Sequence, residues 1–152
     1  LPPKKNWGKI FSWGIPLVIG FIIIYTFINN FRTGIEVTKA WFIWNGSLSA
    51  LGVLLGRGHI LTVLTAFLVA PLSSLNPTLA AGWFAGIVEA YVRKPKVRDF
   101  QELSKGISVK EIWSNKVTRV LLIVVLANLG SVIGTYIGGA SVIKTFLESL
   151  NL

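Results

Sequence analysis

Two pairs of residues near the middle of the sequence have the types and spacing that ion or substrate chemistry inside a membrane requires. Glu89 ends a long apolar run and precedes Arg93 by four residues, so a helix would place both side chains on one face. Asn76 directly precedes Pro77, a pair with which helices often begin. A carboxylate among apolar residues suggests proton or cation handling. The alternative for Glu89 and Arg93 is a structural pair that orients its helix, and we favour that alternative.

The sequence lacks the residue groups on which most enzyme and metal sites depend. It contains no Cys, His59 is its single His and Asp99 its single Asp. Thiolate nucleophiles, disulfides and zinc–thiolate sites are therefore excluded within this chain. No Gly-rich phosphate loop followed by Lys and Ser or Thr is present. We expect no catalytic residue, no metal and no cofactor in this chain.

Composition points to a membrane protein. Of 152 residues, 53% are apolar and 14% are charged, and the net charge is +9. A soluble domain has more charge and less apolar content, with about 25% charged residues, and disordered chains are much less hydrophobic. A basic balance alone would raise nucleic acid as a partner. With this apolar content we expect the lipid bilayer instead, and no nucleic acid.

Runs without charge define the elements that must position these residues. A bilayer-spanning helix needs roughly 17–25 mostly apolar residues, and backbone groups in lipid must bond internally, which favours helices. The sequence therefore predicts three full spans, at about 10–31, 40–56 and 117–147.

A fourth charge-free run, Ile60 to Val88, has 29 residues and contains Pro71, Asn76 and Pro77. One straight helix of this length would measure about 44 Å, well beyond the hydrocarbon core. We therefore predict a Pro-broken hairpin of two short helices, 60–75 and 77–92, with Asn76 as the cap of the second. Either a re-entrant hairpin or two short spans would satisfy this pattern.

The basic residues predict the orientation. With a cytoplasmic N-terminus and a hairpin that returns to its starting side, 12 Lys and Arg residues lie in the cytoplasm and 3 outside. This topology makes 93–115 a basic cytoplasmic loop and leaves the C-terminus outside. Within this loop we predict short amphipathic helices, with Phe100, Leu103 and Ile107 on one face, which rests either on the lipid headgroups or on the bundle.

Small residues recur at four-residue spacing, the pattern of close helix contacts in membranes. We expect them to serve packing within the chain or a homo-oligomer seam, and we favour the first. Polar side chains at membrane depth would join helices by hydrogen bonds or line a polar path. The small residues are Gly52, Gly56, Gly130, Gly134 and Gly138, with Gly82 and Gly86; the polar ones are Asn45, Ser47, Asn76, Asn128, Ser131, Thr135 and Tyr136.

Two segments resemble the membrane domain of the TraB/PrgY pheromone-shutdown family. They are Ala70 to Leu103, APLSSLNPTLAAGWFAGIVEAYVRKPKVRDFQEL, and Ala127 to Gly139, ANLGSVIGTYIGG. The resemblance covers about the last two-thirds of the chain. The matching residues, which we take as candidate functional positions, are Pro71, Asn76, Pro77, Gly82, Trp83, Gly86, Glu89, Arg93, Lys94, Pro95 and Asp99.

The resemblance implies a membrane module of a peptide-handling protein. In that family a soluble domain related to the TIKI and GumN proteins precedes the membrane region, and archaeal as well as enterococcal members exist. This chain opens Leu-Pro-Pro without Met, so we expect a fragment of a longer protein that lacks this soluble domain. Any protease-like activity would belong to the absent domain, not to this chain.

The sequence as a whole predicts an all-α integral membrane protein of the cell membrane, with residues 1–152 as a single transmembrane domain. Its leading function is to anchor and assemble a TraB-type protein, with peptide bound at the hairpin. The alternative is a small transporter or channel in which Glu89 and Asn76 line the path.

Overall fold

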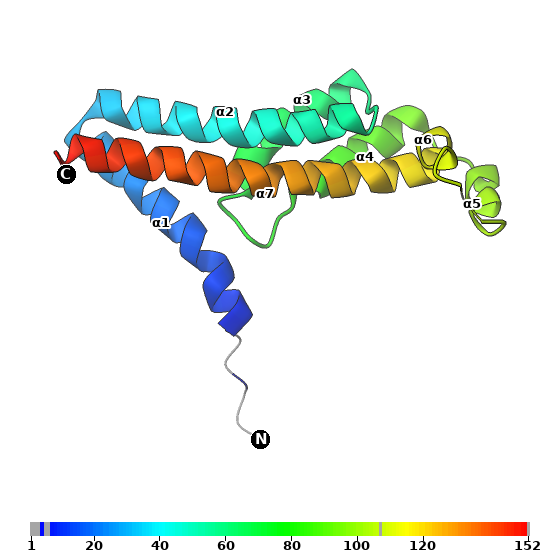
Figure 1. Ribbon diagram of the computed structural model, residues 1–152, viewed down its shortest axis with the longest axis horizontal. Coiled ribbons are helices and arrows are strands. Elements are labelled where there is room, and N and C mark those ends of the chain that lie inside the picture. The colour runs from blue at the N-terminus through cyan, green and yellow to red at the C-terminus, as the bar shows by residue number, and fades with distance from the viewer. Residues whose placement is uncertain (1–3, 5–6, 107, 152) are drawn as a thin grey trace.

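The computed structural model describes residues 4, 7–106 and 108–151 of the chain, and within them every regular element is a helix (Figure 1). The all-helical fold class is confirmed. In chain order the helices are α1 (Trp7–Asn29), α2 (Phe31–Leu55), α3 (Ile60–Ser73), α4 (Ala81–Arg93), α5 (Val97–Leu103), α6 (Glu111–Ser114) and α7 (Lys116–Ser149).

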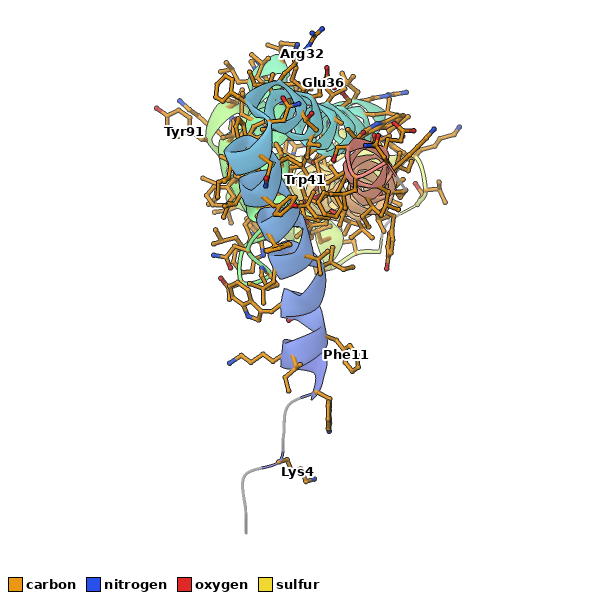
Figure 2. The ribbon with its side chains drawn as sticks, turned by 90° about the vertical axis from the view of Figure 1, so that its left-hand side faces the viewer. Lys4, Phe11, Arg32, Glu36, Trp41 and Tyr91 are labelled. Carbon is orange, nitrogen blue, oxygen red and sulfur yellow. The ribbon has the colours of Figure 1, made fainter. Side chains whose placement is uncertain are left out.

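Helices α2 and α7 form the axis of the molecule and lie side by side along most of their length (Figure 1). The molecule therefore has two ends. The basic end holds the α2–α3 turn, the end of α4, α5, α6 and the beginning of α7. The opposite end holds the α1–α2 turn and the C-terminus. From that opposite end α1 runs obliquely back, and Figure 2 shows Phe11 on its projecting part, away from the bundle.

Glycines let α2 and α7 approach each other closely. A Cβ at Gly52 would overlap the Leu126 carbonyl oxygen, and one at Gly130 would overlap the Leu48 carbonyl oxygen. A Cβ at Gly134 would lie 2.8 Å from Cα of Asn45. Side chains at these positions would push the helices apart, so the glycines place the two backbones in direct contact within one chain.

The structure does not confirm the prediction of three full spans. Among the described residues, α1 and α7 are long and apolar enough to cross a membrane, by length and composition. Helix α2 is not among them. It begins earlier than the predicted span at 40–56, and its first turns carry Arg32, Glu36 and Lys39. Its middle is also the polar core of the bundle, with Asn45 and other small polar side chains.

The segment 32–39 was predicted as a connection and is helical instead. Asn30 begins α2 because its side-chain oxygen accepts from the backbone N–H groups of Arg32 and Thr33, at 3.1 and 3.4 Å. Arg32 and Glu36 then pair across one turn at 3.7 Å. Only Asn30 therefore separates α1 from α2.

The basic loop contains the two short helices α5 and α6, and Asn115 separates α6 from α7. The Asn115 oxygen accepts from the N–H groups of Val117 and Thr118, so a new helix starts there. The amphipathic face predicted in this loop includes Phe100 and Ile107. The Phe100 side chain is 58% exposed, and Ile107 lies outside the described residues.

Candidate functional site

Pro71 shapes the end of α3 and ties it to α2. Because proline has no N–H, it leaves the Phe67 carbonyl without its helical donor, and Gly46 of α2 packs closely against that oxygen. The Pro71 carbonyl in turn accepts from the buried Trp41 indole N–H at 3.0 Å. A buried proline inside α3 is thus accommodated by two residues of α2.

The connection between α3 and α4, residues 74–80, turns back against the middle of α7. The Ser74 hydroxyl donates to Asn45 Oδ1 at 2.7 Å and lies 2.9 Å from the Ser131 hydroxyl. Ser131 is near the centre of the charge-free run 120–143. The outer ends of α3 and α4 both lie at the basic end (Figure 1). The two helices therefore form a hairpin whose tip lies against the middle of α7.

A cleft of about 290 Å3 opens beside this hairpin tip, between the tip, α1 and α7. Its polar lining consists of hydroxyl and amide side chains, while apolar groups complete its walls. No titratable side chain belongs to the described lining. Such a surface donates and accepts neutral hydrogen bonds in an apolar frame. The polar lining residues are Ser12, Ser73, Ser74, Asn128, Ser131 and Thr135, and the others include Pro16, Pro77, Leu79 and Val132.

Asn45 lies fully buried behind the cleft and organises its polar wall. Its Oδ1 accepts from Ser74 at 2.7 Å and from Thr135 at 3.3 Å, whereas its Nδ2 is buried without an acceptor in the structure. A buried amide donor with no partner is costly. The Asn45 amide N–H group, directly behind the wall of the cleft, is therefore left without a hydrogen-bond acceptor.

The prediction that Asn76 caps the second hairpin helix is wrong. Asn76 Oδ1 instead accepts from the backbone N–H and the hydroxyl of Thr78, at 3.0 and 2.6 Å, which closes a turn within the connection. Helix α4 begins later, at Ala81. Its first turn is satisfied from another helix, because the Gly82 N–H donates to Asn128 Oδ1 of α7 at 2.8 Å.

Glu89 is completely buried near the basic end, in the third turn of α4. Its carboxylate accepts from the His59 backbone N–H at 2.9 Å and from the Thr62 hydroxyl at 2.6 Å. It also pairs with Arg93 Nε at 3.1 Å, which is the pairing predicted from their spacing. The carboxylate thereby fixes the α2–α3 turn to α4, a role that its sequence position alone did not reveal.

The structure does not bring Glu89 and Asn76 together. Asn76 lies in the hairpin tip, and Glu89 lies about 12 Å further along α4, counted from Ala81 at 1.5 Å per residue. The donors around Glu89 come from the neighbouring backbone and side chains rather than from the cleft. The two candidate residues therefore belong to different regions of the bundle.

The remaining candidate residues lie on α4 and in the segment that directly follows it. Gly82 and Gly86 face Val124 of α7, whereas Trp83 is 55% exposed on the outer face. Lys94 ends α4 in a left-handed conformation, and Pro95 follows it. Asp99 is the third residue of α5 and accepts from the Lys96 N–H at 2.7 Å.

The polar residues chosen from the sequence divide between the interior and the surface. Asn45, Asn128, Ser131 and Thr135 bond between helices or line the cleft. Ser47 and Tyr136 are exposed on the outer surface instead. Ser49, two residues beyond Ser47 and therefore on a different face of α2, is buried and donates to the Ala127 carbonyl at 3.0 Å.

Metal-binding groups do not assemble in the described part of the chain, since no three His, Cys, Asp or Glu side chains gather there. The described lining of the cleft offers neutral hydrogen-bond donors and acceptors.

Comparison with known proteins gives one family. The family described as "TraB family protein, C-terminal domain" matches residues 7–147. The chain is also 40% identical over 138 residues to a protein of Methanocaldococcus jannaschii described as uncharacterized; this covers 88% of the chain and 35% of that relative. The chain therefore spans about a third of that relative's length. No solved structure matches the chain.

Proposed function

The chain belongs to the TraB family, of which it carries the C-terminal domain, and on this basis we propose that it is the membrane-embedded module that anchors a TraB-type protein and binds peptide at the hairpin cleft. In this proposal the module contributes to peptide pheromone shutdown by holding the peptide. Any cleavage belongs to another part of the full protein.

The distribution of polarity supports the membrane placement. Large apolar side chains point outward from several helices, among them Phe21, Leu64 and Leu129 at 62%, 52% and 53% exposure. Beside its apolar core, the interior holds a set of polar side chains, which are Thr26, Asn45, Ser49, Thr62, Ser73, Glu89, Asn115 and Ser131. A bundle that is apolar outside and hydrogen-bonded inside matches the requirements of lipid. We therefore propose that α1 and α7 cross the bilayer and that α3 and α4 enter it from the basic, cytoplasmic side.

The single observation that carries peptide binding is the cleft at the tip of the re-entrant hairpin. Non-helical backbone at membrane depth is tolerated where it is buried in protein or lines a cavity. Here it lies beside Ser74, Ser131 and Asn128, whose neutral donors and acceptors suit the amide groups of an extended peptide. The apolar wall residues Leu79 and Val132 would contact uncharged side chains of the same peptide.

Photo-crosslinking tests this function. Benzoylphenylalanine replaces Val132, which lines the cleft, or Val125, which lies on the same helix outside it; the two side chains are 52% and 54% exposed. The probe is a biotinylated library of short, uncharged apolar peptides, added to the protein in nanodiscs. Position 132 should capture peptide, and unlabelled library should compete. Equal capture at both positions, or no capture at 132, would refute peptide binding at this cleft.

The transporter alternative makes a different prediction. If Glu89 handled protons on a path, Glu89→Gln would abolish proton flux into proteoliposomes while leaving the protein folded. The three donors that occupy Glu89 and its separation from the cleft favour a structural role. We therefore expect no proton flux with either the parent or the variant.

A further inference from the structure

Three arginines from three helix ends gather at the basic end of the bundle. Arg57 follows the end of α2, Arg93 is the last residue of α4, and Arg119 lies in the first turn of α7. The Arg93 guanidinium donates to the Arg57 carbonyl at 3.4 Å. Arg119 lies within electrostatic range of both Arg57 and Arg93, and of Glu89. The cluster thus combines three cations with one buried carboxylate.

The carboxylate does not balance this charge. Glu89 accepts from Arg93, His59 and Thr62, so its oxygens are occupied. Within the described part of the chain, neither Arg57 nor Arg119 has an acidic side chain within ion-pair distance. The Arg119 Nε is buried and has no hydrogen-bond partner. Like charges held close together without a counterion repel each other, so a bound anion would stabilise the cluster.

The backbone at Arg57 also indicates a role for its side chain. Arg57 has a φ of 57°, the left-handed region, directly after the last turn of α2. Glycine is the residue most often found at this position because it adopts the left-handed region without strain. An arginine in this conformation has a strained backbone, and residues with strained backbones are frequent at binding sites.

The position of the cluster identifies the chemistry of the anion. Arg57 directly follows the charge-free run 40–56, and Arg119 directly precedes the run 120–143. Trp113 lies at the same level, since its indole N–H donates to the Leu55 carbonyl at 3.2 Å. With Arg57 and Lys110 it lines a hollow of about 330 Å3. In a membrane this is the headgroup level, where Trp and Arg side chains meet phosphate groups.

We propose that Arg57, Arg93 and Arg119 form a binding site for a phosphate group at the basic end of the bundle, supplied by an anionic lipid headgroup or by a free phosphate. Guanidinium groups bind phosphate oxygens through paired, charge-assisted hydrogen bonds. The proposal rests on the membrane placement proposed above but not on peptide binding at the cleft.

The test is native mass spectrometry of the full chain released from vesicles of phosphatidylcholine alone or mixed with phosphatidylglycerol. The parent should retain phosphatidylglycerol in preference to phosphatidylcholine. Arg57→Gln and Arg119→Gln should each reduce that retention about tenfold, because each removes charged hydrogen bonds to the phosphate. The matched control is Arg98→Gln, which removes the same charge from an exposed pair with Glu102 on α5 and should leave retention within about twofold.

Arg57→Gly separates binding from folding. Glycine relaxes the left-handed backbone, so the melting temperature should stay unchanged or rise, while lipid retention should fall as in Arg57→Gln. This result would exclude misfolding as the cause of the loss.

A second arm identifies the source of the phosphate. Inorganic phosphate added at millimolar concentration should displace lipid if the natural ligand is a free anion, and should not if it is a headgroup; either result supports the site. The proposal is overturned if the parent shows no preference for phosphatidylglycerol and no response to phosphate. It is equally overturned if Arg98→Gln loses as much retention as Arg57→Gln.

Discussion

At the scale of single residues, the clearest finding is that Glu89 acts as a junction. Its two oxygens join three segments, namely the α2–α3 turn through His59, α3 through Thr62 and its own helix through Arg93. A buried carboxylate is stable only when its hydrogen bonds are satisfied, and here they are. The same geometry explains why the α2–α3 turn can bring Arg57 beside Arg93.

Glu89→Ala should strongly destabilise the protein. The substitution leaves Arg93, 34% exposed, without its partner and the His59 N–H and Thr62 hydroxyl without their acceptor. Breaking a buried pair costs about 3 kcal/mol or more. Thermal unfolding in detergent measures the loss. Glu102→Ala removes an exposed carboxylate of the same spacing and should change stability little; equal losses for the two variants would contradict the junction role.

Residue pairing was predictable only where it is local. The Glu89–Arg93 contact follows from a spacing of four residues. The partners His59 and Thr62 lie about thirty residues away in sequence, and no local pattern encodes them. The prediction that Asn76 caps a helix was wrong for a related reason, because an Asn–Pro pair is common in turns as well as at helix starts.

At the scale of helices, the contact of α2 with α7 depends on glycines that meet the opposite backbone. Gly130→Ala should therefore destabilise the bundle, because its Cβ would overlap the Leu48 carbonyl and force the helices apart. Overpacking of this kind costs about 1–3 kcal/mol. The control is Gly20→Ala in α1, whose Cβ meets nothing within 4 Å and should gain helix propensity. Unfolding midpoints that move in the same direction for both variants would argue against the close contact.

The start of α4 gives a second prediction at this scale. Asn128→Ala removes the acceptor of the Gly82 N–H and should cost about 1 kcal/mol, as the loss of a helix cap does. Asn76→Ala removes only a turn within the connection and should cost less. Hydrogen exchange at the first turn of α4 would report the difference, and a larger effect from Asn76→Ala would restore it as the cap.

Most helices were predictable from the charge-free runs, and their ends were less so. The predicted last span at 117–147 agrees closely with α7, and the Pro-broken run folds into the expected hairpin. The beginning of α2 was missed because a local cap at Asn30 and the Arg32–Glu36 pair extend the helix into a charged segment. The cleft was not predictable, since it forms only where α1, the hairpin tip and α7 meet.

At the scale of the whole molecule, the two ends of the bundle differ in charge. The basic end gathers Arg57, Arg93 and Arg119 with the Lys and Arg residues of the loop between α4 and α7. Arg32 belongs to the beginning of α2 and Lys144 to the last turns of α7, and these helix ends lie at the other end of the bundle (Figure 1). The proposed orientation uses this difference, because Lys and Arg are more frequent in cytoplasmic segments of membrane proteins. Figure 2 shows Arg32 and Glu36 together at the opposite end.

The central claim, that the chain is embedded in a bilayer with its basic end in the cytoplasm, is tested most directly by single-cysteine labelling. The chain has no Cys, so Lys96→Cys at the basic end and Arg32→Cys at the opposite end give no background. A membrane-impermeant maleimide should label position 32 only in right-side-out vesicles and position 96 only in inside-out vesicles. Labelling of both positions from the same side would contradict the claim.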